Sequence, residues 1–201
     1  MKYAVLTGDI VDSSNVSRLV WLTALKEALN CFGSSPTDWY IYRGDSFQLI
    51  LDPLNTLDAI IYIKSSIYSL GGLDVRMALG LSSVDQRMSL VAESGGPAYV
   101  YSGHSYESLD DRSLIQRSEW PQLDRTVNLI FLLMERIMSD WTVVSSKTLR
   151  QRLLHPDWTQ AQLAGHLMKT QSNISRDLKR VAYDELRAVS DWYKLELKKY
   201  L

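Results

Sequence analysis

The sequence has only one cysteine, Cys31, among its 201 residues. A single cysteine excludes a disulfide within the chain and a cysteine-based zinc site, and it fits a reducing compartment. No apolar run reaches the roughly 18 residues that a membrane-spanning helix requires. A strand-like segment directly follows Met1, where a signal peptide would need a charged and then an apolar region. We therefore expect a cytoplasmic protein with no membrane partner.

The chain also lacks an excess of either charge. Its 22 lysines and arginines nearly balance 23 aspartates and glutamates, which gives a net charge of −1. Any affinity for nucleic acid must therefore come from a local basic patch rather than from global attraction. The three histidines have no cysteine or carboxylate partners at metal-ligand spacing, and neither a P-loop nor a nucleophile elbow is present.

What is present is an ordinary globular composition, 46% hydrophobic and 22% charged. In the first half, β-prone and helical segments alternate. The expected strands are residues 3–11, 39–42, 47–51 and 75–81, and the expected helices are residues 16–32 and 53–70. The order β-α-β-β-α-β predicts an α+β fold with a ferredoxin-like sheet and both helices on one face. We expect this domain to span residues 1–121, and an all-α region to span residues 122–201.

Two aspartates follow glycines where this topology brings strands together. Asp9 lies near the end of the first strand, and Asp45 lies in the turn of the central hairpin. Because the first strand borders that hairpin, the two carboxylates could jointly bind Mg²⁺, which prefers carboxylates and phosphate oxygens. The following turn would offer backbone N–H groups to a phosphate through Ile10, Val11, Asp12, Ser13 and Ser14. The alternative is that these aspartates are turn and capping residues.

A helix, a tight turn and a second helix are predicted between Thr159 and Arg180, at the spacing of a DNA-binding helix-turn-helix. Apolar residues at helical spacing give the two helices a shared core, with Ala164 as the small residue where they cross. Met168 stands in the turn, where glycine is usual. The predicted DNA-binding residues are Lys169, Gln171, Ser172, Asn173, Arg176, Lys179 and Arg180. The alternative is a helical hairpin with a solvated basic face.

Two further apolar patterns lie in the second half. Residues 123–141 have helical spacing, which predicts a long helix that packs on one of the two units. Apolar residues then recur at intervals of three and four at Leu186, Val189, Tyr193, Leu197 and Tyr200. This stripe either packs on its own domain or pairs two subunits, as in dimeric readers of symmetric DNA sites. We expect a homodimer.

Three motifs in the first half resemble those of class III nucleotidyl cyclases, namely TGDIVDSS, YRGDSFQLIL and DVRMALGLSS. The resemblance implies a cyclase-like or palm-like fold, in which Asp9 and Asp45 match the metal-binding aspartates and residues 10–14 match the triphosphate-facing turn. The family's Asn and Arg on a later helix align with Val100 and His104, and Ile41 stands where the family has a purine-reading residue. No cyclase activity is expected from a site changed in this way.

The whole chain resembles the bacterial SatD family, through GDIVDSS, YRGDSFQ, AYVYSGHSYESL and TQSNISRDLKR. This resemblance implies that a nucleotide-type domain is joined to a DNA-binding tail. Two functions stay open. The first is a transcriptional regulator that binds duplex DNA, with an N-terminal domain that senses a nucleotide or a metal. The second is a Mg-dependent enzyme that acts on a nucleotide through Asp9 and Asp45, with the helix-turn-helix as an accessory.

Overall fold

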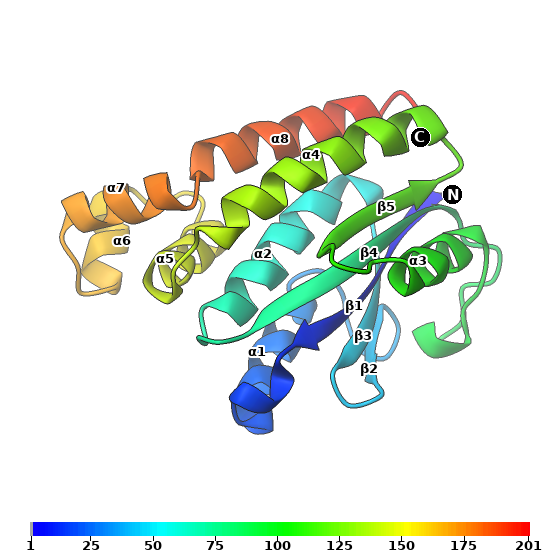
Figure 1. Cartoon of the computed structure of the whole chain (residues 1–201), viewed down its shortest axis with the longest axis horizontal. Helices are drawn as coiled ribbons and strands as arrows, with labels where there is room; N and C mark the ends of the chain where they lie inside the picture. The colour runs from blue at the N-terminus through cyan, green and yellow to red at the C-terminus, as the bar shows by residue number, and fades with distance from the viewer. Residues whose placement is uncertain (1) are drawn as a thin grey trace.

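The structure, a computed structural model, describes residues 2–201 and combines a five-stranded mixed sheet with helices (Figure 1). The strands are β1 (Lys2–Val11), β2 (Trp39–Tyr42), β3 (Ser46–Leu51), β4 (Asp74–Ser83) and β5 (Leu114–Ser118). Within the described residues there are eight α-helices: α1 (Arg18–Asn30), α2 (Thr56–Tyr68), α3 (Pro97–Glu107), α4 (Pro121–Ser139), α5 (Val143–Leu154), α6 (Gln160–His166), α7 (Gln171–Arg180) and α8 (Tyr183–Leu197). Three short 3₁₀ turns, η1 (Ser13–Asn15), η2 (Pro53–Asn55) and η3 (Val91–Glu93), join them.

The strand order across the sheet is β2-β3-β1-β4-β5. β1 runs antiparallel to both β3 and β4, and β2 and β3 form an antiparallel hairpin. The four strands expected from alternation are confirmed within two residues at each end. The fifth strand, which pairs in parallel with β4, was not predicted. The prediction of an α+β fold is therefore correct at the level of class.

One face of the sheet carries the main hydrophobic core. Leu6 of β1 and Leu79 of β4 turn toward this face, where they belong to the same buried cluster as Leu25 of α1 and Ile63 of α2. Alternation along each strand sends neighbouring side chains to opposite faces. Helices α4, α5 and α8 contribute to the same cluster, which contains Phe131 of α4 and Leu149 of α5. One continuous core thus covers this face.

Helix α3 packs on the opposite face of the sheet (Figure 1). Its close approach depends on Gly80 of β4, because a Cβ at that position would lie 2.0 Å from the carbonyl oxygen of Ala98 and 2.5 Å from the amide nitrogen of Ser102. The buried hydroxyls of Thr7 and Ser102 are hydrogen-bonded to each other between β1 and α3. Glycine therefore brings the helix backbone directly onto the sheet.

Helix α8 returns the end of the chain to the main core. Leu186, Tyr193 and Leu197 are at most 2% exposed, and Val189 and Tyr200 pack against the same cluster. The apolar stripe is thus buried by its own chain, which is the first of the two expected outcomes. This burial gives no support to the alternative that the stripe pairs two subunits. Residues from both sides of the expected boundary at 121 and 122 belong to this cluster.

Polar contacts add to this attachment of α8. Asp58 of α2 accepts hydrogen bonds from Ser190 at 2.8 Å and from Lys194 at 2.5 Å, and Arg187 lies 3.3 Å away. Asp58 thus ties three positions of α8 to α2.

No helix within residues 2–201 combines the length and the hydropathy that crossing a membrane demands.

We predict that Tyr193→Phe lowers the free energy of unfolding by about 1–3 kcal/mol, because it leaves a buried acceptor without its donor. The hydroxyl of the fully buried Tyr193 donates to Oε1 of Gln116 at 2.8 Å, and Gln116 is itself only 2% exposed. Urea unfolding followed by tryptophan fluorescence measures the change. Tyr200→Phe is the matched control, because its ring lies at the edge of the core. Equal stability of the wild type and the Tyr193 variant would contradict the prediction.

Candidate functional site

Asp9 lies on the α3 face of the sheet, where β1 pairs with both of its neighbours. Its Cα is opposite Arg76 of β4 and Ser46 of β3. Arg76 donates two hydrogen bonds to the carboxylate, from Nη2 at 2.9 Å and from Nε at 3.2 Å. The Asp9 side chain is 14% exposed, and its hydrogen bonds raise the pKa of Arg76. In this bidentate ion pair, both carboxylate oxygens of Asp9 accept a hydrogen bond from Arg76.

The backbone of Asp45 contacts the strand that carries Asp9. Asp45 precedes Ser46 in the hairpin turn, and its carbonyl oxygen accepts a hydrogen bond from the Ile10 amide at 3.3 Å. Its carboxylate accepts a second one from the Ser13 hydroxyl at 2.8 Å. Topology therefore brings the two aspartates to the same end of the sheet. Among residues 2–201, however, no three His, Cys, Asp or Glu side chains form a group suited to a metal.

The expected phosphate-binding turn divides into two parts. Ile10 and Val11 are still in β1, opposite Val75 and Asp74 of β4. Asp12 then has a left-handed conformation with φ of 58°, and Ser13 and Ser14 begin the 3₁₀ turn η1. Helix α1 starts only at Arg18. The turn consequently does not lead directly into the helix N-terminus, and the Ile10 amide already has an acceptor in Asp45.

Phenol groups gather around the Asp9–Arg76 pair. Tyr106 comes from α3, and burial followed by the charge of Asp9 raises the pKa of its hydroxyl. Burial, together with the neighbouring phenols of Tyr40 and Tyr106, raises the pKa of Tyr42 to about 12. The rings of Tyr40 and Tyr42 stack with centroids 5.0 Å apart. Sequence reasoning missed Arg76 and Tyr106, because only the strand register and the position of α3 bring them to Asp9.

The residues aligned with other cyclase positions lie elsewhere. Val100 and His104 are one turn apart on α3, and both are exposed rather than turned toward the sheet. Ile41 packs against the main core, on the face opposite Asp9. The three positions therefore do not join the Asp9 cluster in this structure.

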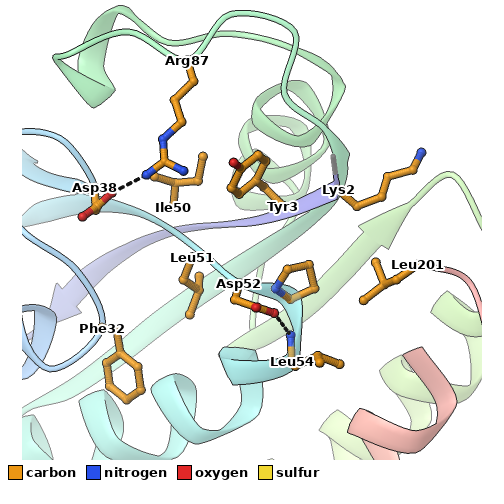
Figure 2. Close-up of a pocket in the computed structure, with 11 residues that line it drawn as sticks. Lys2, Tyr3, Phe32, Asp38, Ile50, Leu51, Asp52, Leu54, Arg87 and Leu201 are labelled. Atoms are coloured by element: carbon orange, nitrogen blue, oxygen red, sulfur yellow. Dashed lines mark hydrogen bonds and ion pairs between the residues drawn. The ribbon is translucent and has the colours of Figure 1, made fainter. Parts of the chain in front are cut away.

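A separate cavity of about 550 Å³ opens at the other end of β1 and β3 (Figure 2). Its charged groups already have partners. Arg87 pairs with Asp38 at 2.5 Å, and Asp52 accepts the Leu54 amide at 2.8 Å. Lys2 pairs with Glu119. The cavity is thus lined by apolar side chains and by charged groups that already have partners. None of the residues predicted to bind a ligand lines it.

The helical pair expected near the end of the chain is formed by α6 and α7. Thr159 caps α6 in a reciprocal capping box with Gln162, and the Thr170 hydroxyl accepts the Asn173 amide at the start of α7. Leu163 and Ala164 of α6 form a small buried cluster with Ile174 and Leu178 of α7. This cluster is separate from the main core. The predicted shared core of the two helices is confirmed.

Helix α7 has a polar, solvent-facing side. Gln171, Ser172, Arg176, Lys179 and Arg180 are exposed, whereas Ile174 and Leu178 are buried. Positions 172, 176, 179 and 180 recur at helical spacing, so they lie on one face. Asn173 is half-buried, and its side-chain oxygen accepts a hydrogen bond from Arg176 at 2.8 Å.

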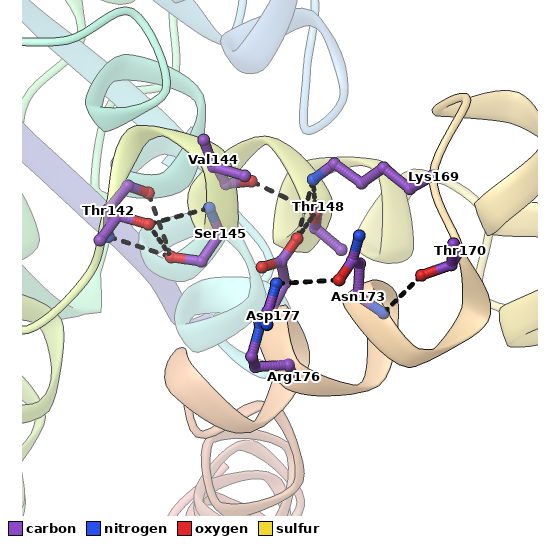
Figure 3. A network of polar contacts seen from close by, with 9 residues as sticks. All are labelled: Thr142, Val144, Ser145, Thr148, Lys169, Thr170, Asn173, Arg176 and Asp177. Atoms are coloured by element: carbon purple, nitrogen blue, oxygen red, sulfur yellow. Dashed lines mark hydrogen bonds and ion pairs between the residues drawn. The ribbon is translucent and has the colours of Figure 1, made fainter.

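Lys169 turns inward instead of joining this face (Figure 3). Its ammonium donates to Asp177 of α7 at 2.8 Å and to the Thr148 hydroxyl of α5 at 2.9 Å. Thr148 also donates to Asp177 at 2.9 Å. This buried network compensates the charge of Asp177, which is 8% exposed, and it ties α7 to α5. The ammonium of Lys169, which was predicted to bind DNA, is therefore engaged in attaching α7 to α5.

Comparisons with protein-family models, with curated proteins and with solved structures found no significant match.

The turn between α6 and α7 contains a strained residue. Met168 has φ of 52°, in the left-handed region, and its side chain is 94% exposed. We predict that Met168→Gly raises the stability of the protein by roughly 0.5–1 kcal/mol, because glycine adopts this conformation without the steric cost of a Cβ. Thermal or urea unfolding measures the gain. Met168→Ala is the control, because it keeps a Cβ in the same left-handed conformation and should bring no comparable gain. A loss of stability in the Met168→Gly variant would contradict the prediction.

Proposed function

We propose that this protein binds duplex DNA through α6 and α7, which act as a helix-turn-helix with α7 as the recognition helix, and that it regulates transcription. The observation that carries the proposal is the division of α7 into two faces. Hydroxyl, amide and cationic side chains face solvent at Ser172, Gln171, Arg176, Lys179 and Arg180, while the opposite face is buried against α6 and α5. Such side chains bond base edges and phosphate oxygens.

The contacts that fix the position of α7 support the same proposal. The network of Lys169, Asp177 and Thr148 holds α7 on α5, and Val181, directly after α7, is buried in the main core. A reading helix whose position is set by packing binds without first ordering itself, which lowers the entropic cost of association. With a net charge of −1, the protein depends on this local patch for affinity.

We expect the protein to bind duplex DNA in a salt-dependent way, and Arg176→Ala or Arg180→Ala to weaken binding. A lost phosphate contact reduces the salt slope by about one unit, and a lost base contact costs roughly 1–3 kcal/mol. Fluorescence anisotropy with labelled genomic fragments measures both effects. Arg125→Ala on α4 is the matched control, because Arg125 is exposed and distant in sequence from α7. Absence of binding by the wild type near 50 mM salt would leave α6 and α7 as a helical hairpin.

For the first half we infer a ferredoxin-like, cyclase-like domain of the kind that the SatD resemblance implies. The support is that β4, β1, β3 and β2 are neighbours in that order and are all antiparallel, with α1 and α2 on the same face. The parallel strand β5 and helix α3 extend this arrangement. The homodimer stays a prediction. The stripe on α8 does not support it, because that stripe is buried within its own chain.

The second candidate is a nucleotide-binding or nucleotide-processing domain that uses Mg²⁺. It is favoured by the proximity of Asp9 and Asp45 at one end of the sheet. The present side-chain arrangement does not fit a resident metal, because Arg76 occupies both oxygens of Asp9. A nucleotide phosphate would offer Arg76 another anionic partner and would supply oxygens to the cation.

We expect Mg²⁺ with ATP to raise the melting temperature by about 2–4 °C, which corresponds to roughly 1 kcal/mol for a chain of this size, and to do so more than either ligand alone. Asp9→Asn and Asp45→Asn should each remove this increment. Asp157→Asn, which alters an exposed carboxylate between α5 and α6, is the control. No cyclic nucleotide should form. Steady formation of a cyclic nucleotide by the wild type, and by neither variant, would favour the enzyme. A wild type whose melting temperature does not respond to metal and nucleotide would leave both aspartates as turn residues.

A further inference from the structure

The outer edge of the sheet at β2 is open. β2 is the last strand on its side, and its sequence Trp39-Tyr40-Ile41-Tyr42 contains neither proline nor a charged residue. Natural edge strands usually carry such residues, because an unprotected edge pairs with other chains. The open edge of β2 therefore has the composition of a strand that accepts a partner.

The register shows which backbone groups face this edge. The Ile50 amide donates to the carbonyl oxygen of Asp38 at 2.8 Å, and the β2–β3 pairing continues from there. In an antiparallel ladder, hydrogen-bonded and non-bonded pairs alternate. Trp39 and Ile41 therefore point their N–H and C=O groups away from β3. Within residues 2–201 these groups make no backbone hydrogen bond outside the strand pairing.

A groove of about 710 Å³ runs along this edge, between β2 and α1. One stripe of α1 lines it with Arg18, Leu22, Lys26 and Asn30, at intervals of four residues. Both cations are exposed, and neither forms an ion pair in the part of the chain that the structure describes. The nearest described charge pair of α1 uses Glu27, which bonds Arg150 on the other side. The groove thus combines unpaired backbone groups with two unpaired positive charges.

We propose that this groove binds an extended acidic peptide segment of a partner protein, which adds a strand to β2 and places carboxylates against Arg18 and Lys26. The main-chain bonds would come from Trp39 and Ile41, and an apolar side chain between the carboxylates would contact Leu22. This is strand addition at a sheet edge, in which the backbone supplies affinity and alternate side chains supply specificity.

The spacing of the two cations defines the partner. Eight helical residues separate Arg18 from Lys26, a rise of about 12 Å. Side chains on one face of a strand are spaced by about 6.8 Å, so residues four apart are separated by about 13.5 Å. The groove therefore matches acidic residues at positions i and i+4 of a strand, with an apolar residue at i+2.

Charge also argues against a second copy of this chain in the groove. Antiparallel pairing of two β2 strands about a two-fold axis would bring the two α1 stripes together, with Arg18 of one copy near Lys26 of the other. Like charges placed opposite each other are destabilising. An acidic segment satisfies the same backbone groups and neutralises both cations.

The probe is a fluorescein-labelled seven-residue peptide with glutamate at its second and sixth positions, valine at its fourth and threonine elsewhere. The full-length protein should bind it, and the double variant Arg18→Glu, Lys26→Glu should bind at least about tenfold more weakly, a change of 1.4 kcal/mol. Arg125→Glu, which reverses an exposed charge on α4, should leave the affinity unchanged. A peptide with lysines in place of the glutamates should not bind.

A further peptide separates strand addition from simple charge attraction. N-methylation of the amides that would face β2 removes the donors while it keeps both glutamates, and it should abolish binding. Equal affinity of the methylated and unmethylated peptides would overturn the proposal. So would absence of binding of the parent peptide at millimolar concentration. Sedimentation of the wild type as a dimer that the peptide dissociates would instead assign the edge to a second copy.

Discussion

The hydrophobic core on one face of the sheet is the constraint on which the rest of the structure depends. Five strands present a face that α1 and α2 do not cover alone, and the core is completed by α4, α5 and α8. Because α8 follows α7 directly, the end of the chain has to return to the sheet after the α6–α7 pair. That pair is consequently held between two helices, α5 and α8, that are both anchored in the core. Packing, not a linker, sets the orientation of α7.

Charges near this core are paired, and the pairs decide which side chains are free to act. Lys64 is 3% exposed and bonds Asp74 at 2.7 Å, and Asp58 gathers contacts from α8. Lys169 belongs to this group because it compensates Asp177. An uncompensated charge at such a position is costly, so these residues are poor candidates for ligand binding. The exposed cations of α7 do not compensate a buried charge, so they are free to bind a ligand.

Periodicity predicted the elements that have long apolar patterns, and the predicted topology placed Asp9 and Asp45 at the same end of the sheet. β5 escaped prediction because its five residues, Leu114 to Ser118, include two long polar side chains, and its burial comes from β4 and α4. The Asp9–Arg76 pair joins residues 67 positions apart, and it depends on the register of β1 against β4. The inward turn of Lys169 likewise depends on Thr148 of another helix. Contacts of this kind leave no local pattern in a sequence.

The Asp9–Arg76 pair also determines how a ligand could enter the end of the sheet. A cation alone would have to break two charge-assisted hydrogen bonds and would then lie beside a guanidinium of the same sign. A phosphate that arrived with the cation would give Arg76 a new partner and would cancel that repulsion. In the proposed nucleotide site, metal and phosphate would therefore favour each other, and neither would be favoured alone. The cations on the exposed face of α7 already face solvent, so the proposed contact with DNA would need no comparable rearrangement.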